Sequence, residues 1–278
     1  MTRVSRKLRQ MQSWAGSVNG PADWPAALLL GFFRTRPPTG TGPAARAMRR
    51  MFPYVWIRPQ SLSGWRLRIN PSRMSQFVIY EEVFIARAYN LARVAFVPDA
   101  VVDCGAFEGY FSLLAKARFP GAPVIAFEPD AENFEGLRAN IDANRLDVDA
   151  RSEAVSTTDG EASFVGEGCG GRLAGAGEAG RTGTVATCDL RRVLAQLASA
   201  RLLLKLDIEG EERSLIPAIL QMLPPRCAVF FEWHHGDESF QQVAGLMRDA
   251  GFAVERHRTM VDDGVTFIDA FAQRDGVQ

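Results

Sequence analysis

Charged side chains that could do chemistry lie in one short segment directly after an apolar run. The segment reads Lys205-Leu206-Asp207-Ile208-Glu209-Gly210-Glu211-Glu212 and follows three leucines. Burying charge is costly unless the charge is paired or used, and side chains two residues apart share a strand face. We therefore expect Asp207 to serve catalysis and cofactor binding, and Lys205 and Glu209 to bind substrate. The alternative is a salt-bridged helix start with acids in its first turn.

Two adjacent histidines mark a second segment, Phe230-Phe231-Glu232-Trp233-His234-His235. A histidine can take up a proton near neutral pH, so His234, or else Asp207, is expected to act as the base in catalysis. Glu232 and His235 are expected to bind substrate. An imidazole that only packs on the neighbouring tryptophan is the competing interpretation. No metal is expected in the site. The alternative is a divalent cation held by Asp207, Glu232 and a histidine.

A turn with two glycines forms a third segment, Asp103-Cys104-Gly105-Ala106-Phe107-Glu108-Gly109. A dinucleotide is disfavoured, because Phe107 stands at the second glycine of G-x-G-x-x-G and Asp103 would repel a pyrophosphate. S-adenosylmethionine instead carries a cationic sulfonium and a cationic amino group, and it is the expected cofactor. An NAD-dependent oxidoreductase is the rival. The contacts expected in this loop are Asp103, Gly105, Ala106, Glu108 and Gly109.

Further cofactor contacts are expected after the next two strands. Glu128 stands 23 residues beyond Gly105 (128 − 105), where nucleotide-binding sheets place an acid for the ribose hydroxyls, and Pro129 follows it. An acid that only favours the next helix is the alternative. Glu153 and Ala154 are expected to line the adenine, with ordinary loop residues as an equal alternative.

The elements that must position these residues alternate between strands and helices. Apolar runs predict strands at 65–69, 100–104, 123–127, 150–155, 202–206 and 227–232. Helices are predicted at 77–89, at 110–118, at 130–144 with Asp130 as N-cap, after the strand at 202–206 through 223, and at 240–250. Repeated strand–helix units predict an α/β fold with a mostly parallel sheet, which binds ligands beyond the carboxyl ends of its strands.

Two hairpins are also predicted. Residues 253–256 and 265–271 flank Val261-Asp262-Asp263-Gly264, a pattern typical of a C-terminal antiparallel hairpin at the sheet edge. Residues 161–165 and 184–187 form the second hairpin around a glycine-rich loop, 166–183. This loop and the region before Val97 are expected to recognise the acceptor, since substrate sites are built from variable loops.

The composition is that of a globular chain without a polyanionic partner. Of its 278 residues 47% are hydrophobic, and Lys+Arg equals Asp+Glu at 32 each, so no nucleic acid partner is expected. The cysteines are scattered without a C-x-x-C pair, which disfavours zinc and disulfides and favours a reducing, cytoplasmic location. No apolar run is long enough to cross a membrane, and no secretory signal is recognisable. The sequence leaves the oligomeric state open.

The first 53 residues differ from the rest. They carry nine basic residues against Asp23 alone, and the run Arg36-Pro37-Pro38-Thr39-Gly40-Thr41-Gly42-Pro43 is typical of a linker. We expect residues 1–53 to be a basic N-terminal extension, solvated or partly disordered, that precedes a domain at 54–278. Binding of this segment to nucleic acid or an anionic membrane is the less favoured alternative.

Several motifs together resemble the FkbM family of methyltransferases. The loop 103–109, Phe127-Glu128-Pro129 and the family's K-x-D-x-E-G-x-E pattern at Lys205–Glu212 are similar to it. Thr187-Cys188-Asp189-Leu190 is similar to T-L-D-x-L with Cys188 replacing Leu, and Glu232-Trp233-His234 to E-x-H. The resemblance covers about residues 54–272. One departure is Glu108, where many members have Asn.

The resemblance implies the class I methyltransferase (Rossmann-like) fold, S-adenosylmethionine as methyl donor, and O-methylation of a small-molecule or sugar acceptor. Methyl transfer from an activated donor mainly needs the acceptor oxygen to be positioned and to lose its proton. A metal-assisted O-methyltransferase and a non-catalytic scaffold of the same fold are the alternatives. A scaffold has no reason to bear the desolvation cost of so many charges at the strand ends.

Overall fold

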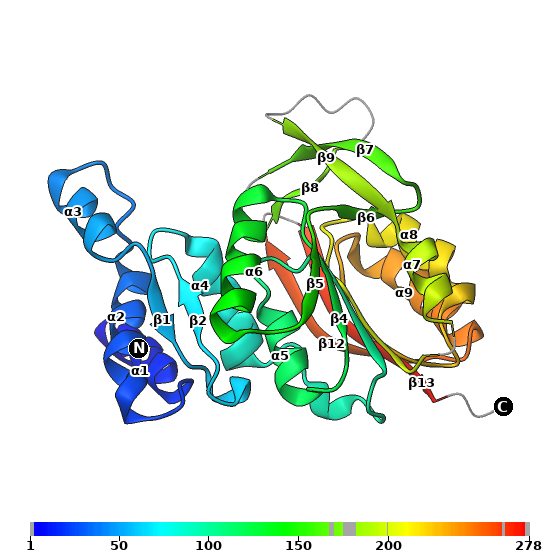
Figure 1. Ribbon diagram of the computed structural model, residues 1–278, viewed down its shortest axis with the longest axis horizontal. Coiled ribbons are helices and arrows are strands. Elements are labelled where there is room, and N and C mark those ends of the chain that lie inside the picture. The colour runs from blue at the N-terminus through cyan, green and yellow to red at the C-terminus, as the bar shows by residue number, and fades with distance from the viewer. Residues whose placement is uncertain (1–2, 167–169, 175–181, 199, 263–264, 276–278) are drawn as a thin grey trace. The chain divides into compact units, whose positions relative to one another are not determined.

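The computed structural model describes residues 3–166, 170–174, 182–198, 200–262 and 265–275. The chain forms two compact units (Figure 1): an N-terminal unit, Met1–Ala88 with Ala139–Arg145, and a sheet unit, Tyr89–Arg138 with Leu146–Gln278. The expected boundary after residue 53 stays a prediction. Cys169, most of the loop 166–183 and the turn residues Asp263 and Gly264 lie outside the described residues.

A seven-stranded sheet of order β12-β13-β11-β10-β3-β4-β5 forms the centre of the sheet unit. Neighbouring strands are parallel, except that β13 runs antiparallel to both β11 and β12. The predicted mostly parallel sheet with a C-terminal hairpin is confirmed, but the antiparallel strand lies one place inside the edge. The strands are β3 (Ala100–Cys104), β4 (Val124–Phe127), β5 (Val148–Arg151), β10 (Leu202–Leu206), β11 (Arg226–Trp233), β12 (Ala253–Asp262) and β13 (Val265–Asp275).

Helices lie on both sides of this sheet because its central strands are apolar on both faces. Every residue of β3 and β10 is buried. Figure 1 shows α7 (Leu190–Gln196), α8 (Glu212–Ile219) and α9 (Gly236–Asp249) together on one side and α5 (Tyr110–Arg118) on the other. The helix α6 (Ala131–Asn144) begins where predicted, since Asp130 Oδ1 accepts a hydrogen bond of 2.8 Å from Asn133 N. Short 3₁₀ turns are Leu91–Arg93 and Leu220–Met222.

A second, four-stranded sheet of order β6-β9-β7-β8 was not predicted. The strand expected at 150–155 is wrong, because polar Ser152 and Glu153 interrupt it: β5 ends in the large sheet and β6 begins in the small one. The expected hairpin is confirmed as β7 against β9. The strands are β6 (Ala154–Ser156), β7 (Gly160–Val165), β8 (Arg172–Leu173) and β9 (Thr182–Asp189).

The N-terminal unit is built of helices around a small hairpin, in which β1 pairs antiparallel with β2. The fully buried Trp14 ring stacks on Tyr80 at 4.3 Å, and its Nε1 donates to Glu81 Oε1 at 3.0 Å. The elements are α1 (Arg3–Gly16), α2 (Trp24–Thr35), α3 (Pro43–Met51), β1 (Val55–Ile57), β2 (Leu67–Ile69), α4 (Met74–Tyr80), the π-helical turn Glu81–Ala86, and 3₁₀ turns Pro21–Asp23 and Gln60–Leu62.

The expectation of a solvated or partly disordered lead-in before residue 54 is therefore wrong. Trp14, Leu30 and Phe33 are fully buried, and Arg34, one of the basic residues, pairs with Glu81 at 3.2 Å. The apolar positions on α1 and α2 outweigh the basic composition, because buried apolar surface stabilises a helix regardless of its charged face. Between residues 36 and 42 the expected loop is confirmed. Among the described helices, none has the length and apolar character that crossing a bilayer requires.

Candidate active site

The order of the large sheet reverses between β3 and β10. From β3 the chain continues to β4 and β5 on one side, and it returns to β10 and β11 on the other. In open α/β sheets, ligands bind at the carboxyl ends of the strands at such a switch point. The two strand ends are joined there by a hydrogen bond of 3.2 Å from Asp207 N to Cys104 O. The expected site residues therefore converge on this edge.

The glycine loop folds tightly at the end of β3. Gly105 N and Ala106 N both donate to Phe127 O, at 3.0 and 2.8 Å. Gly105, Phe107 and Gly109 have φ values of 76°, 52° and 80°, the left-handed region that glycine adopts without strain. The helix α5 begins directly after Gly109. The loop thus has the special backbone that its two glycines predicted, plus an unpredicted left-handed phenylalanine.

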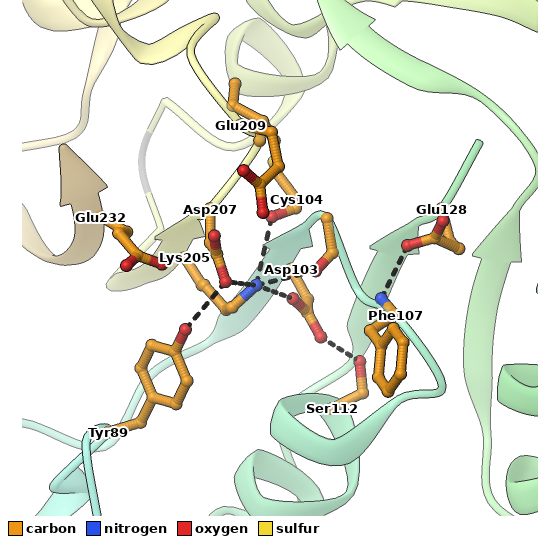
Figure 2. A network of polar contacts seen from close by, with 12 residues as sticks. Tyr89, Asp103, Cys104, Phe107, Ser112, Glu128, Lys205, Asp207, Glu209 and Glu232 are labelled. Atoms are coloured by element: carbon orange, nitrogen blue, oxygen red, sulfur yellow. Dashed lines mark hydrogen bonds and ion pairs between the residues drawn. The ribbon is translucent and has the colours of Figure 1, made fainter. Parts of the chain in front are cut away.

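Glu128 is held beneath this loop. Its Oε2 accepts from Phe107 N at 2.7 Å (Figure 2). Its Oε1 accepts from Asp130 N at 2.9 Å and from Asn133 Nδ2 at 3.3 Å. Burial raises the pKa of Glu128 to about 8, against the opposing effect of these hydrogen bonds. In this structure the carboxylate shapes the loop, and its contact with ribose hydroxyls stays a prediction.

A buried chain of charges connects β3 with β10. Lys205 Nζ lies 3.5 Å from Asp103 Oδ1 and 3.3 Å from Asp207 Oδ2, and donates to Gly105 O at 2.8 Å (Figure 2). Asp103 Oδ2 accepts from Ser112 Oγ at 2.6 Å. Burial raises the pKa of Asp103. For Lys205, burial lowers the pKa, but Asp207 and Asp103 outweigh it and raise the pKa.

This network confirms the predicted pairing of Lys205 with Asp207 and leaves the predicted cofactor contact of Asp103 open. Lys205 and Asp207 share a strand face and pair, as their spacing predicted. Asp103 has no exposed surface, so its carboxylate contacts protein groups here, and direct contact with a cofactor stays a prediction. The pKa of Asp207 is lowered, because Lys205 and His234 outweigh the effect of burial. Its side chain is 20% exposed and is open to a ligand.

Tyr89 is a site residue that the sequence analysis missed. Its hydroxyl donates to Asp207 Oδ2 at 3.1 Å, and its ring packs edge-on against Phe111 and Phe230 at 5.1 and 5.8 Å. Tyr89 lies outside any strand end, so no positional signal marks it. Its place before Val97, in a region expected to recognise the acceptor, was the available hint.

His234 lies between two carboxylates. Its Nε2 is 3.3 Å from Glu209 Oε2 and its Nδ1 is 3.3 Å from Glu212 Oε1. Burial lowers the pKa of His234, but the hydrogen bonds to Glu209 and Glu212 outweigh it and raise the pKa to about 11. Glu212 is fully buried and accepts from Ile208 N and Gly210 N at 2.8 and 2.9 Å, so it fixes the imidazole to the turn after β10.

Glu209 and Glu232 complete the acidic end of the site. Glu232 Oε2 lies 4.0 Å from His234 Nε2, and its carboxyl group is within hydrogen-bonding distance of Asp207. Glu209 has a left-handed backbone with φ 56°, and burial raises its pKa. Among the described residues, Asp207, Glu232 and His234 form one group whose potential ligand atoms lie within 4.8 Å of one another.

The remaining predicted residues lie around this centre with protein contacts of their own. His235 Nε2 is hydrogen-bonded to Gly210 O at 2.7 Å, and its ring lies edge-on to Trp233. Glu108 is buried against α6, where a Cβ on Gly136 would stand 2.4 Å from its Cδ. Pro129 and Glu153 are half-buried, and Ala154 is buried in the small sheet. Their ligand contacts stay predictions.

The strand order with its one antiparallel strand, and a glycine loop at the switch point, define the class I methyltransferase fold. A family model described as "Methyltransferase FkbM domain" matches residues 103–254, which include the glycine loop and the acidic segment. The chain belongs to the FkbM methyltransferase family.

The chain is similar to several other proteins over different shares of its length. It is 29% identical over 211 residues to "31-O-demethyl-FK506 methyltransferase FkbM" of Streptomyces tacrolimicus, which is 63% of this chain and 81% of that protein. It is 36% identical over 73 residues to "Methyltransferase sdnD" of Sordaria araneosa, 26% of this chain and 28% of that protein. A solved structure, M. jannaschii TYW2 in complex with AdoMet, has a TM-score of 0.48 at 13% identity, over 80% of this chain and 86% of that one.

Proposed function

We propose that the protein transfers a methyl group from S-adenosylmethionine to a hydroxyl oxygen of a small molecule or sugar. The proposal rests on the switch point of the large sheet. There the glycine loop after β3 and the carboxylates of Asp207, Glu209 and Glu232 lie at the same edge of the sheet. A side chain at Gly105 would collide with Asp207 O, so only a glycine lets the loop after β3 and the end of β10 meet this closely at the switch point. FkbM of Streptomyces tacrolimicus, a relative over most of its length, is named as an O-methyltransferase.

The residues at the strand ends fit this cofactor. Asp207, Glu209 and Glu232 are partly exposed carboxylates, and carboxylates favour the sulfonium and ammonium cations of S-adenosylmethionine. Phosphate groups would meet the same carboxylates with repulsion, which disfavours a dinucleotide. When bound, the cofactor supplies a methyl group already activated by a positive sulfur. The chain then has to hold the acceptor oxygen in line and accept its proton.

We assign proton removal to the group of His234, Asp207 and Glu209. The raised pKa of His234 keeps its imidazole protonated near neutral pH, so a carboxylate beside it accepts the proton and His234 positions that carboxylate. Tyr89 and Lys205 hold Asp207 in place, and Glu212 holds His234. The half-buried ring of Tyr89, whose hydroxyl donates to Asp207 and which packs on the buried Phe230, offers an apolar face on which a small molecule or sugar ring can pack.

The proposal is tested by equilibrium binding of S-adenosylmethionine and of NAD to the full chain, followed by transfer of a labelled methyl group to a panel of hydroxylated small molecules and sugars. We expect S-adenosylmethionine to bind and NAD not to bind. Binding of NAD alone would replace the proposal with an oxidoreductase.

A His234→Ala variant tests the catalytic assignment. We expect cofactor binding to persist while turnover at saturating substrate falls by a factor of about 10²–10⁴, the usual range when assisted proton transfer is lost, because the carboxylates lose the imidazole that positions them. The exposed His257 provides a control, since His257→Ala should leave both unchanged. Loss of binding with unchanged turnover at saturation would remove His234 from catalysis.

A further inference from the structure

Three side chains from two neighbouring strand ends form a mixed oxygen and nitrogen donor set. Asp207 follows β10, and Glu232 and His234 belong to the end of β11. One ligand atom from each lies within 4.8 Å of the others, a spacing that small side-chain movements would close around one ion, since carboxylate and imidazole bonds to divalent metals are about 2.0–2.2 Å long. Glu232 and His234 are 15% and 8% exposed at their side chains.

The imidazole has the orientation of a metal ligand. Glu212, fixed by two backbone N–H groups, faces His234 Nδ1 and leaves Nε2 directed toward Glu232 and Glu209. Metal-binding histidines almost always direct their second ring nitrogen toward a carboxylate or carbonyl, and Glu212 Oε1 lies 3.3 Å from Nδ1. A histidine that only packs in a core needs no carboxylate fixed behind it.

Asp207 is oriented in the same manner. Tyr89 Oη and Lys205 Nζ both contact Oδ2, so Oδ1 is the oxygen to which a cation would bind. Figure 2 shows the Glu232 carboxylate turned toward that of Asp207, and the two are within hydrogen-bonding distance. Two ionised carboxylates this close repel each other, so the pair either keeps a shared proton or holds a cation.

We propose that Asp207, Glu232 and His234 bind a divalent cation of the Mn²⁺-to-Zn²⁺ series, which in turn binds the acceptor oxygen; the second part rests on the proposed methyl transfer. Carboxylates suit Mn²⁺ and imidazole suits Zn²⁺ and Fe²⁺, so a mixed set selects this series over Ca²⁺. This proposal departs from the sequence-based expectation of a site without metal.

The cation would make the acceptor a better nucleophile by polarising its hydroxyl group. The O–H bond breaks and its proton passes to the Glu209 carboxylate, which lies beside His234. The oxygen electron pair forms the new O–C bond as the C–S bond breaks, and that electron pair stays on sulfur. Asp207 and His234 would then promote proton removal through the cation.

Mn²⁺ binding to the full, metal-stripped chain tests the site without any assay of activity. Electron paramagnetic resonance counts free Mn²⁺, and calorimetry with Mn²⁺ and Zn²⁺ gives the affinity. We expect one Mn²⁺ per chain, and at least tenfold weaker binding for Asp207→Asn and for Glu232→Gln. Matched controls are Glu211→Gln, which lies outside the donor set, and His257→Ala on an exposed surface; both should bind as the parent chain does.

His234→Ala is the most direct variant, but it opens a space next to a buried carboxylate. Circular dichroism and thermal unfolding therefore accompany each variant, and the near-isosteric Glu232→Gln carries the conclusion if His234→Ala unfolds. Parent and Asp207→Asn/Glu232→Gln chains that bind Mn²⁺ and Zn²⁺ equally, or neither ion, would overturn the proposal.

The two proposals fail in different ways. If neither Mn²⁺ nor Zn²⁺ binds while methyl transfer persists in a chelator, the proposed function stands and the metal site is wrong. If Mn²⁺ binds at the three residues and S-adenosylmethionine does not bind, the metal site stands and the proposed function is wrong. When both hold, chelator should abolish methyl transfer without abolishing cofactor binding, and Mn²⁺ should restore it.

Discussion

The backbone of Gly105 lies against the carbonyl group of Asp207, so closely that a Cβ added to Gly105 would stand 1.8 Å from that oxygen. The contact joins the ends of β3 and β10 at the switch point of the sheet. Because the φ of Gly105 is also 76°, an L side chain at this position would be both strained and in collision. The glycine is thus required by the protein fold as well as by any ligand.

Gly105→Ala is expected to destabilise the sheet unit and to abolish cofactor binding. The collision forces the ends of β3 and β10 apart, and we expect a loss of about 2–4 kcal/mol, the range for strain combined with a core disturbance. Urea unfolding gives the stability, and calorimetry with S-adenosylmethionine gives the binding. Gly121→Ala is the control, since a Cβ there meets nothing within 4 Å. Equal stability and binding in both variants would contradict the close approach.

Glu128 should make stability depend on pH between about 5 and 8. Its pKa is raised from 4.5 to about 8 by burial, so between these values the folded chain binds a proton that the unfolded chain has lost. Stability from this group is therefore largest at low pH and falls as the pH rises toward 8. Urea unfolding across this range should show a shallower fall for Glu128→Gln than for the parent chain. An identical slope in the two chains would show that Glu128 titrates normally.

Removing Lys205 alone should lower the free energy of unfolding more than removing Lys205 together with the charge of Asp103. Lys205→Met leaves Asp103 and Asp207 without their shared counter-charge, and breaking a buried pair costs about 3–5 kcal/mol. The double variant Asp103→Asn/Lys205→Met removes one of the stranded charges, so it should recover part of the loss. Unfolding free energies of the three chains form the measurement. A double variant less stable than Lys205→Met would mean that Asp103 contributes through Ser112 more than through Lys205.

Trp14 should hold the N-terminal helices in place. It belongs to α1 and is fully buried against Phe77 and Tyr80, and truncating a buried tryptophan costs about 3–5 kcal/mol. Hydrogen exchange over residues 3–35 should therefore accelerate on the order of a hundredfold or more in Trp14→Ala. Trp24→Ala is the matched control, because Trp24 is 49% exposed and should change exchange little. If the parent chain exchanged equally fast over residues 3–35, the expectation of a partly disordered N-terminal segment would be correct.

The sheet and its strand ends could be predicted because their signals are local. The runs at 100–104 and 202–206 are apolar except for Asp103 and Lys205, and they form β3 and β10 with the predicted bounds. Lys205 and Asp207 were placed together by strand alternation alone. The glycine loop was recognisable because left-handed backbone selects glycine.

The remainder depends on contacts between residues distant in sequence. Tyr89 reaches Asp207 across 118 positions, and no spacing rule connects them. The buried role of Asp103 follows from Lys205 on the adjacent strand, and the charge of His234 follows from Glu209 and Glu212, which belong to the turn after β10. In the N-terminal segment, the basic composition concealed the apolar faces of α1 and α2. Between β5 and β6, the break at Ser152 and Glu153 could be recognised only because β6 belongs to a different sheet.

The position of β13 has a consequence for how the chain is made. It pairs with β11 over eight residues, Val229 with Ala272 among them, and Phe271 packs on Phe230 at 4.7 Å. During synthesis β11 emerges from the ribosome before β13, so one edge of a buried apolar strand waits unpaired until residues 265–275 have been translated. Such an edge can template wrong pairing. The large sheet is thus completed only after β13 has been made, and until then β11 has a free edge that other strands can pair with.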